Sequence, residues 1–357
     1  MNEEVYRRLR EHLDRLPGGF APSDTGADIR LLQLLFAPEE AALAVHLTLD
    51  REEAATIARR ADLPLAEVEQ RLHEMFLKGL ISAWFPPDGS VLYQALQMVV
   101  GIYEWQVNNL TPEFLTAWED YWLTRQRRPR VETIPQMRTI PVGQSLAPEL
   151  AVLPWEQVDN LVDSHTKFGV LPCICRRHAR LRGGGCDAPD ESCLVFGEAA
   201  ESLARSGRAR IIDRDEVKRI LAAADAGNRV LQPSNSKEAA FICTCCGCCC
   251  GVLGGLKRQA KPAEAVANAF IVSLEVNACQ GCWACLERCQ MDALSEDGDR
   301  VALNGDRCIG CGLCVSTCPS GALTLVRKPG GLPYAIPDTQ DETIRIIAEA
   351  QQRARAA

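Results

Sequence analysis

The sequence lacks several features that would indicate a membrane protein or a hydrolase. No cysteine occurs among the first 172 residues, and no segment reaches the 18 or so uninterrupted apolar residues that a membrane-spanning helix requires. The five histidines are scattered, no glycine-rich phosphate loop precedes a predicted helix, and no Gly-x-Ser-x-Gly motif occurs. These absences exclude a predicted membrane span and argue against hydrolytic chemistry.

Cysteine is abundant in the second half of the chain. The 357 residues contain 18 cysteines, eight of which fall between positions 279 and 318. The beginning, MNEEVYRRLREHL, is charged and amphipathic rather than signal-like, so we expect a cytoplasmic protein. A reducing compartment keeps thiols free, which favours metal or cluster ligation over disulfides. The net charge of −8 disfavours nucleic acid as the main partner.

The segment 28–96 has the pattern of a winged helix-turn-helix. Hydrophobic periodicity predicts several helices, two of them joined at 62–64, and the turn residues at 86–89 predict a hairpin. Such a unit either binds DNA or serves as a docking module. The expected recognition helix carries Glu67, Glu69 and Glu74, which repel phosphates. The charge pattern therefore favours docking over DNA binding.

Two cysteine runs with the same spacing occur near the C-terminus. The first is Cys279-x2-Cys282-x2-Cys285-x3-Cys289, and the second is Cys308-x2-Cys311-x2-Cys314-x3-Cys318-Pro319. In such runs three thiolates from one loop bind one cluster, and the fourth cysteine binds the other cluster. Zinc sites usually use two separated pairs instead. On these residues, the segment 273–329 closely resembles a bacterial two-cluster ferredoxin.

This resemblance implies two [4Fe-4S] clusters with crossed ligands. Carried over residue by residue, it assigns one cluster to Cys279, Cys282, Cys285 and Cys318, and the other to Cys308, Cys311, Cys314 and Cys289. Two positions depart from the family pattern: Gln290 replaces a proline and Trp283 replaces a usual glycine. Neither is a ligand. Trp283 either shields the first cluster from water, which would shift its potential, or packs on a neighbouring domain.

Ten further cysteines lie upstream of the ferredoxin-like segment. They are Cys173, Cys175, Cys186, Cys193, Cys243, Cys245, Cys246, Cys248, Cys249 and Cys250. We expect them to bind metal, as one or two additional [4Fe-4S] clusters or as zinc, because both kinds of centre need about four thiolates. Neighbouring cysteines chelate one iron poorly, so the six thiols in 243–250 must serve more than one centre or stay partly free. A dithiol/disulfide site and an unusual cluster with an open coordination position remain open alternatives.

Four arginines surround the first of these cysteines. Arg176, Arg177, Arg180 and Arg182 lie between Cys175 and Cys186. Nearby cations lower the pKa of thiols and offset the charge of a thiolate-ligated centre. The arginines either serve that purpose, receive an anionic substrate or partner, or form a solvated basic strip.

We predict an α+β fold divided into several domains. These are a helical domain at 1–128, with the winged-helix-like unit at 28–96; a proline-rich linker at 129–154; a cysteine-rich α+β domain at 155–268; a ferredoxin-like two-cluster domain at 269–329; and a C-terminal helical tail at 330–357. As a whole, this order of parts resembles 4Fe-4S dicluster domain-containing proteins of anaerobes, a group that brings no assigned substrate.

The predicted function is iron-sulfur electron transfer within an anaerobic oxidoreductase system. An electron carrier or oxidoreductase component fits the sequence better than a stand-alone enzyme, and the expected partner is a redox protein or a larger oxidoreductase complex. The alternative is an iron-sulfur redox or oxygen sensor that regulates transcription through residues 28–96. The catalytic residues, the redox partner and the oligomeric state cannot be assigned from the sequence.

Overall fold

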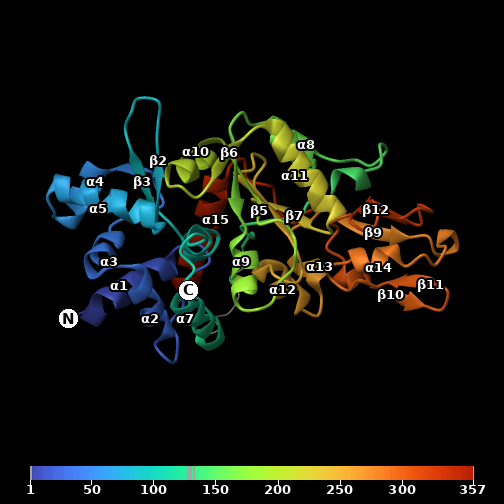
Figure 1. Ribbon diagram of the computed structural model, residues 1–357, viewed down its shortest axis with the longest axis horizontal. Coiled ribbons are helices and arrows are strands. Elements are labelled where there is room, and N and C mark those ends of the chain that lie inside the picture. Colours follow the sequence, from blue (N-terminus) through green and yellow to red (C-terminus); the bar gives the residue numbers. More distant parts are fainter. Residues whose placement is uncertain (1, 127–130, 132, 357) are drawn as a thin grey trace. The chain divides into compact units, whose positions relative to one another are not determined.

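The computed structural model describes residues 2–126, 131 and 133–356 (Figure 1). Two compact units are present: unit 1 comprises Met1–Ile134, Glu198–Arg210 and Ile344–Ala357, and unit 2 comprises Pro135–Gly197 and Ile211–Thr343. The start of the predicted linker, at residues 129, 130 and 132, lies outside the described residues. None of the described helices is long and apolar enough to cross a membrane.

Unit 1 is mainly helical and contains one small sheet with the strand order β1-β3-β2. Its elements are α1 (Asn2–Arg15), α2 (Ala27–Leu35), α3 (Pro38–Ala44), β1 (Glu52–Glu53), α4 (Ala54–Ala61), α5 (Leu65–Lys78), β2 (Ile81–Trp84), β3 (Leu92–Ala95), η1 (Met98–Ile102), α6 (Tyr103–Trp105) and α7 (Pro112–Thr124), with most of α10 (Gly197–Arg205) and α15 (Gln340–Ala356). The two helices joined at 62–64 and the hairpin at 81–95 are present, whereas a winged-helix fold remains a prediction.

Aromatic side chains of α7 fill the core of unit 1. Phe114, Trp118 and Tyr121 are buried, and the Trp118 ring stacks on Tyr103 with 4.0 Å between ring centroids. Trp122 lies at the edge of this face, 39% exposed, with the Arg125 guanidinium 3.5 Å above its ring. The spacing of these residues places them on one face of the helix, which therefore packs inward.

Unit 2 is built on a five-stranded sheet with the order β6-β4-β5-β8-β7, followed by two two-stranded sheets, β12-β9 and β10-β11. Its elements are η2 (Gly143–Ser145), η3 (Pro154–Glu156), α8 (Val158–Asp163), β4 (Phe168–Pro172), α9 (Ile174–Leu181), β5 (Glu191–Phe196), β6 (Arg210–Ile212), α11 (Arg214–Ala226), β7 (Val230–Pro233), β8 (Phe241–Cys245), α12 (Gly251–Lys257), α13 (Pro262–Ala265), β9 (Phe270–Leu274), η4 (Val276–Ala278), α14 (Ala284–Arg288), β10 (Leu294–Asp297), β11 (Arg300–Leu303), η5 (Gly305–Arg307) and β12 (Leu323–Arg327).

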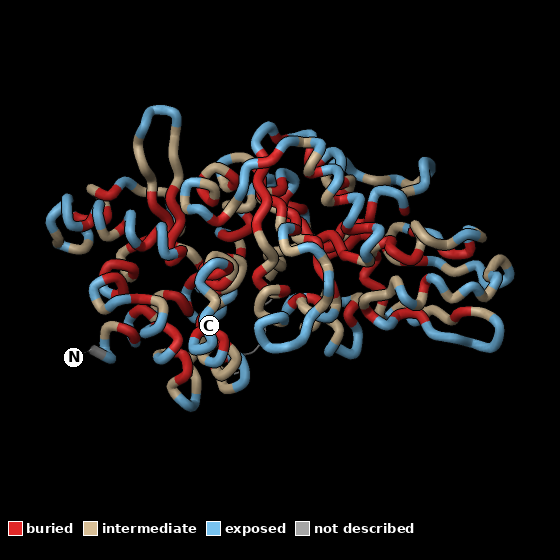
Figure 2. The backbone as a smooth tube through the Cα atoms, in the orientation of Figure 1, coloured by how far each residue is buried: buried red, intermediate tan, exposed pale blue. Residues whose placement is uncertain are grey.

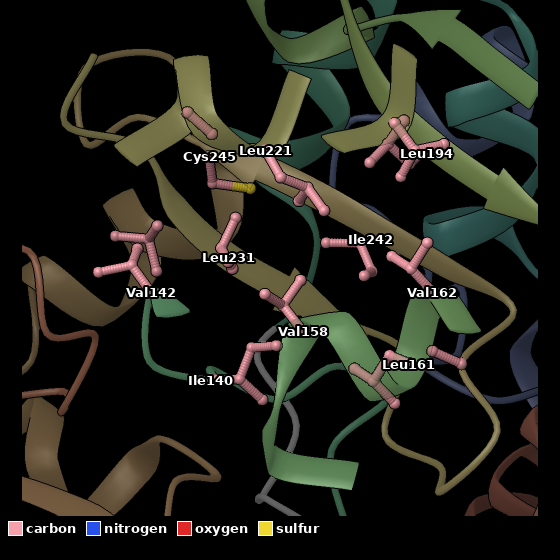
Figure 3. Close-up of a cluster of buried hydrophobic side chains, with 14 of the residues drawn as sticks. Ile140, Val142, Val158, Leu161, Val162, Leu194, Leu221, Leu231, Ile242 and Cys245 are labelled. Carbon is pink, nitrogen blue, oxygen red and sulfur yellow. The ribbon is translucent and has the colours of Figure 1, made fainter. Parts of the chain in front are cut away.

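One hydrophobic core joins the five-stranded sheet to the C-terminal cysteine repeat. Leu194, Leu231 and Ile242 project from the strands, and Figure 3 shows Cys245 among these apolar side chains. The same core continues into the repeat through Met291, Ile309 and Leu313. Figure 2 shows the strands as the most continuously buried part of unit 2, whereas most of the loop at 181–190 is exposed. The sheet and the repeat therefore pack as one body.

The loops between the repeated cysteines require glycine at two positions. Gly281 and Gly310 have φ angles of +63° and +65°. A Cβ atom at Gly281 would lie 2.3 Å from the carbonyl oxygen of Asp299, and one at Gly310 would lie 2.2 Å from that of Phe270. No other residue type fits without moving the backbone. The first loop thus lies tightly against the turn between β10 and β11, and the second lies tightly against β9.

Candidate metal centres

The eight cysteines of the C-terminal repeat line two cavities. The first cavity is lined by Cys279, Cys282, Cys285 and Cys318. The second cavity is lined by Cys289, Cys308, Cys311 and Cys314. The last cysteine of each run thus lies with the first three cysteines of the other run. This is the arrangement that two four-thiolate clusters would need, so the donor set fits the group that the spacing predicts.

The two cavities differ in their exposure to solvent. Cys282 of the first cavity is exposed, whereas Cys308 and Cys314 of the second cavity are buried. Burial raises the pKa of the Cys311 thiol to about 12. A thiol in such surroundings becomes a thiolate only when a positive charge, such as a bound metal, compensates it. Of the eight cysteines that line the two cavities, Cys282 is thus the one that solvent reaches most freely.

Trp283 occupies a backbone conformation that favours glycine. Its φ angle is 61°, close to the 76° of Gly312 at the equivalent position of the second run. The indole side chain is half-buried and lines the first cavity beside Cys282. The indole therefore forms part of the wall of the first cavity, which is the position that it needs in order to shield a bound cluster from water.

Hydrogen-bond donors approach the sulfur atoms of both crossing cysteines. The backbone N–H of Ala293 donates to Cys289 Sγ at 3.2 Å. The Ser320 hydroxyl lies 3.7 Å from Cys318 Sγ. Hydrogen bonds of this kind stabilise the negative charge on a thiolate ligand and tune the centre that it holds.

Four of the ten upstream cysteines form a tight group, here called the outer quartet. Its members are Cys186, Cys246, Cys248 and Cys249, and their four Sγ atoms all lie within 4.8 Å of one another. Cys186 comes from the loop after α9, and the other three come from the turn between β8 and α12. Burial opposes ionisation of Cys186, but the N–H of Ala188 and the neighbouring thiols lower its pKa to about 7. The outer quartet therefore has the donor set of a metal site.

The other six upstream cysteines lie along the sheet and are here called the inner group. Its members are Cys173, Cys175, Cys193, Cys243, Cys245 and Cys250. The thiol of Cys175 interacts with those of Cys173 and Cys250, and the thiol of Cys250 also interacts with that of Cys245. Cys243 lies directly opposite Cys193 on the neighbouring strand, with 3.7 Å between the two Sγ atoms.

The two groups explain how six cysteines fit into eight positions. Cys243 and Cys245 lie two residues apart on β8, so their side chains share one face of the sheet. The next residue, Cys246, belongs to the outer quartet, and Cys250, which caps α12, belongs to the inner group. Two of the three vicinal pairs, Cys245-Cys246 and Cys249-Cys250, are therefore divided between the two groups, whereas Cys248 and Cys249 both belong to the outer quartet. Sequence reasoning predicted that the six thiols must be divided but not which thiol joins which group.

Three of the four arginines near Cys175 are held by hydrogen bonds or ion pairs within the protein. Arg176 is fully buried and donates to the oxygen atoms of Pro189, Ser192 and Thr244 at 2.5, 2.6 and 3.1 Å. Arg177 pairs with Asp190 at 2.7 Å, and Arg180 donates to the carbonyl oxygen of Cys186 at 2.7 Å. The solvated-strip interpretation is therefore wrong for Arg176, which lies among the thiols.

Two residues that sequence reasoning did not assign connect the cysteine repeat to other parts of unit 2. Gln290, noted in the sequence only as a departure from proline, accepts a hydrogen bond from the N–H of Gly247 at 2.6 Å through its side chain. Arg288 pairs with Asp225 of α11, and both side chains are 11% exposed. The departure at position 290 was the available signal for Gln290. Arg288 had no such signal, because its partner lies 63 residues away.

Comparison with known proteins identifies the C-terminal repeat. Residues 278–328 match the 4Fe-4S dicluster domain family. No curated protein and no solved structure matches the chain. The match includes all eight cysteines that line the two cavities and none of the upstream ten. The C-terminal segment is therefore similar to 4Fe-4S dicluster domains, and this similarity supports iron-sulfur electron transfer.

Proposed function

We propose that this protein relays single electrons through two [4Fe-4S] clusters as part of an anaerobic oxidoreductase system. The observation that carries the proposal is the pair of cavities, each lined by four cysteines drawn from both runs. The cysteines of the first cavity would hold one cluster, and those of the second cavity would hold the other. When bound, such a cluster accepts and releases one electron at a time.

The protein side chains around the first cavity support a role as the entry point. Cys282 is exposed, so a redox partner can approach this side closely. Leu274, Val301 and Leu323 contribute apolar side chains to the lining of this cavity. Thiolates with an exposed edge are susceptible to oxidation, which is consistent with an anaerobic setting.

The second cavity leads toward the inner group. Cys289 and Cys311 pack against the same hydrophobic core that contains Cys245 and Cys250. Continuous apolar packing excludes water between them. We therefore propose that the inner group holds a third iron-sulfur centre, which would extend the relay from the dicluster domain to the five-stranded sheet.

Iron and acid-labile sulfide analysis tests the proposal on anaerobically purified full-length protein, together with EPR of the reduced state. We expect about twelve irons per chain and EPR signals from more than two centres. The variants Cys245→Ser and Cys250→Ser should lose about four irons while the dicluster signals persist. About eight irons, unchanged in these variants, would eliminate the third centre. Fewer than eight would contradict the two-cluster relay itself.

The structure gives little support to the alternative of a DNA-binding sensor. Glu67, Glu69 and Glu74 are all exposed on α5, the helix that would enter the DNA groove. Three carboxylates on that surface repel the phosphate backbone. We therefore place the role of unit 1 in docking rather than in DNA recognition.

A further inference from the structure

We propose that the outer quartet binds a single zinc ion rather than an iron-sulfur cluster. The Sγ atom of Cys186 lies 3.7 Å from that of Cys246 and 3.8 Å from that of Cys249. The Sγ atoms of Cys248 and Cys249 are 3.6 Å apart. Four thiolates arranged tetrahedrally at the usual zinc–sulfur bond length of about 2.3 Å have neighbouring sulfur atoms about 3.8 Å apart. The quartet thus has the dimensions of a site for one tetrahedral ion.

The dicluster cysteines provide a comparison within the same chain. In a cubane cluster each thiolate binds a different iron, so its sulfur ligands must lie farther apart than they do around one ion. Among the described residues, the four ligand atoms of the outer quartet all lie within 4.8 Å of one another. Neither set of four dicluster cysteines forms so compact a group. The quartet is too compact for a cube.

The charges around the quartet match those of a zinc tetrathiolate. Zn²⁺ with four thiolates carries a net charge of −2. Arg176 and Arg229 are 0% and 4% exposed, and no carboxylate of a described residue pairs with either guanidinium. Arg176 Nη2 lies 3.9 Å from Cys246 Sγ, and the Nε atom of each arginine has no hydrogen-bond partner among the described residues. Both guanidinium groups interact electrostatically with Cys186 and Cys246, so the negative charge of a metal-bound quartet would compensate two buried cations.

The location of the quartet indicates what the zinc ion does. It would join Cys186, in the exposed loop after α9, to the turn that follows β8. That turn is flanked by Cys245 and Cys250 of the inner group, so fixing it also fixes these two thiols. Zinc does not change its oxidation state, so the site is structural. The metal assignment is independent of the proposed electron transfer, and only this positioning role depends on it.

Metal analysis of full-length protein, purified anaerobically from medium containing both iron and zinc, tests the assignment. We expect one zinc ion per chain, lost in Cys248→Ser without loss of iron. The matched control is Cys282→Ser, because Cys248 and Cys282 are both exposed cysteines. The control should lose about four irons and keep its zinc. Zinc that persists in Cys248→Ser, or iron that is lost with it, would overturn the proposal.

X-ray absorption at the zinc edge provides a readout that does not depend on variants. We expect four sulfur atoms at about 2.3 Å and no neighbouring metal atom. Cys248→His should retain zinc, because a site of three cysteines and one histidine also binds it, and this variant guards against a folding defect in Cys248→Ser. A shell of neighbouring metal atoms, nitrogen or oxygen ligands in the unmodified protein, or the absence of zinc would each contradict a zinc tetrathiolate.

Discussion

At the scale of single residues, Trp283 combines backbone strain with a position on the wall of the first cavity. A side chain with a Cβ atom in the left-handed region costs about 1–2 kcal/mol relative to glycine. The equivalent residue of the second run, Gly312, avoids this cost at φ 76°. A tryptophan at this position is therefore best explained by what its ring does, which is to cover the first cavity beside the exposed Cys282.

Replacing Trp283 by glycine should raise the reduction potential of the first cluster by tens of millivolts. Removal of the indole admits water, and water stabilises the additional negative charge of the reduced state. Trp283→Phe is the control, because phenylalanine keeps an apolar ring at the same backbone position and should shift the potential less. Redox titration followed by EPR measures both clusters, and the second should not change. Equal potentials in the two variants would exclude shielding.

Glu104 in unit 1 should make stability depend on pH. Its carboxylate accepts a hydrogen bond from the N–H of Gly101 at 2.7 Å, and burial raises its pKa from 4.5 to about 7. Between these pH values the folded state binds more protons than the unfolded state. The resulting stabilisation is fully present below pH 4.5 and is lost as the pH rises through about 7.

The variant Glu104→Gln should remove this dependence and stabilise unit 1 above pH 7 by on the order of 1–2 kcal/mol. Urea unfolding followed by tryptophan fluorescence measures the effect, because four of the six tryptophans lie in unit 1. The exposed Glu113 supplies a matched control in Glu113→Gln. If the two variants respond to pH in the same way, Glu104 is not the titrating group.

At the scale of elements, the turn between β8 and α12 is held by contacts from the dicluster domain. The side chain of Gln290 accepts a hydrogen bond from the N–H of Gly247. Gly247 lies in the sequence between Cys246 and Cys248, two members of the outer quartet. A Cβ atom at Gly247 would lie 3.0 Å from the backbone oxygen of Gln290, so the two segments are in close contact. The Arg288–Asp225 pair joins α14 to α11 in the same body. The turn that carries the quartet is therefore braced by the neighbouring sheet and by the repeat.

Gln290→Ala should release the metal of the outer quartet to a chelator about 10-fold faster, because residues that orient a metal loop have effects of this size. The variant leaves the N–H of Gly247 without its acceptor. Gln290→Glu keeps an acceptor oxygen and should behave like the unmodified protein. The rate is measured with a colorimetric zinc chelator under anaerobic conditions. Equal rates in the two variants would show that this hydrogen bond does not support the site.

At the scale of the whole molecule, some sites are defined by neighbouring residues and others by distant ones. The eight dicluster cysteines were predictable because two to three residues between ligands determine how one loop surrounds a cluster. The division of the upstream cysteines was not, because Cys186 and Cys246 are brought together across 60 residues. The burial of Arg176 was equally hidden, since the sequence shows it only as one of several adjacent cations. The β-strand alternation at Cys243 and Cys245 was the one local clue to the inner group.

The division of the thiols predicts the order in which they react. Anaerobic treatment with a zinc chelator should expose the outer quartet, and Cys248 should be alkylated first because it is the exposed member. The inner group and the dicluster cysteines should stay protected by burial or by bound iron. Mass spectrometry of digested protein identifies the modified residues. Alkylation spread evenly over all ten upstream cysteines would mean that they form one site, whereas modification confined to the quartet would establish that two separate sites share a single turn.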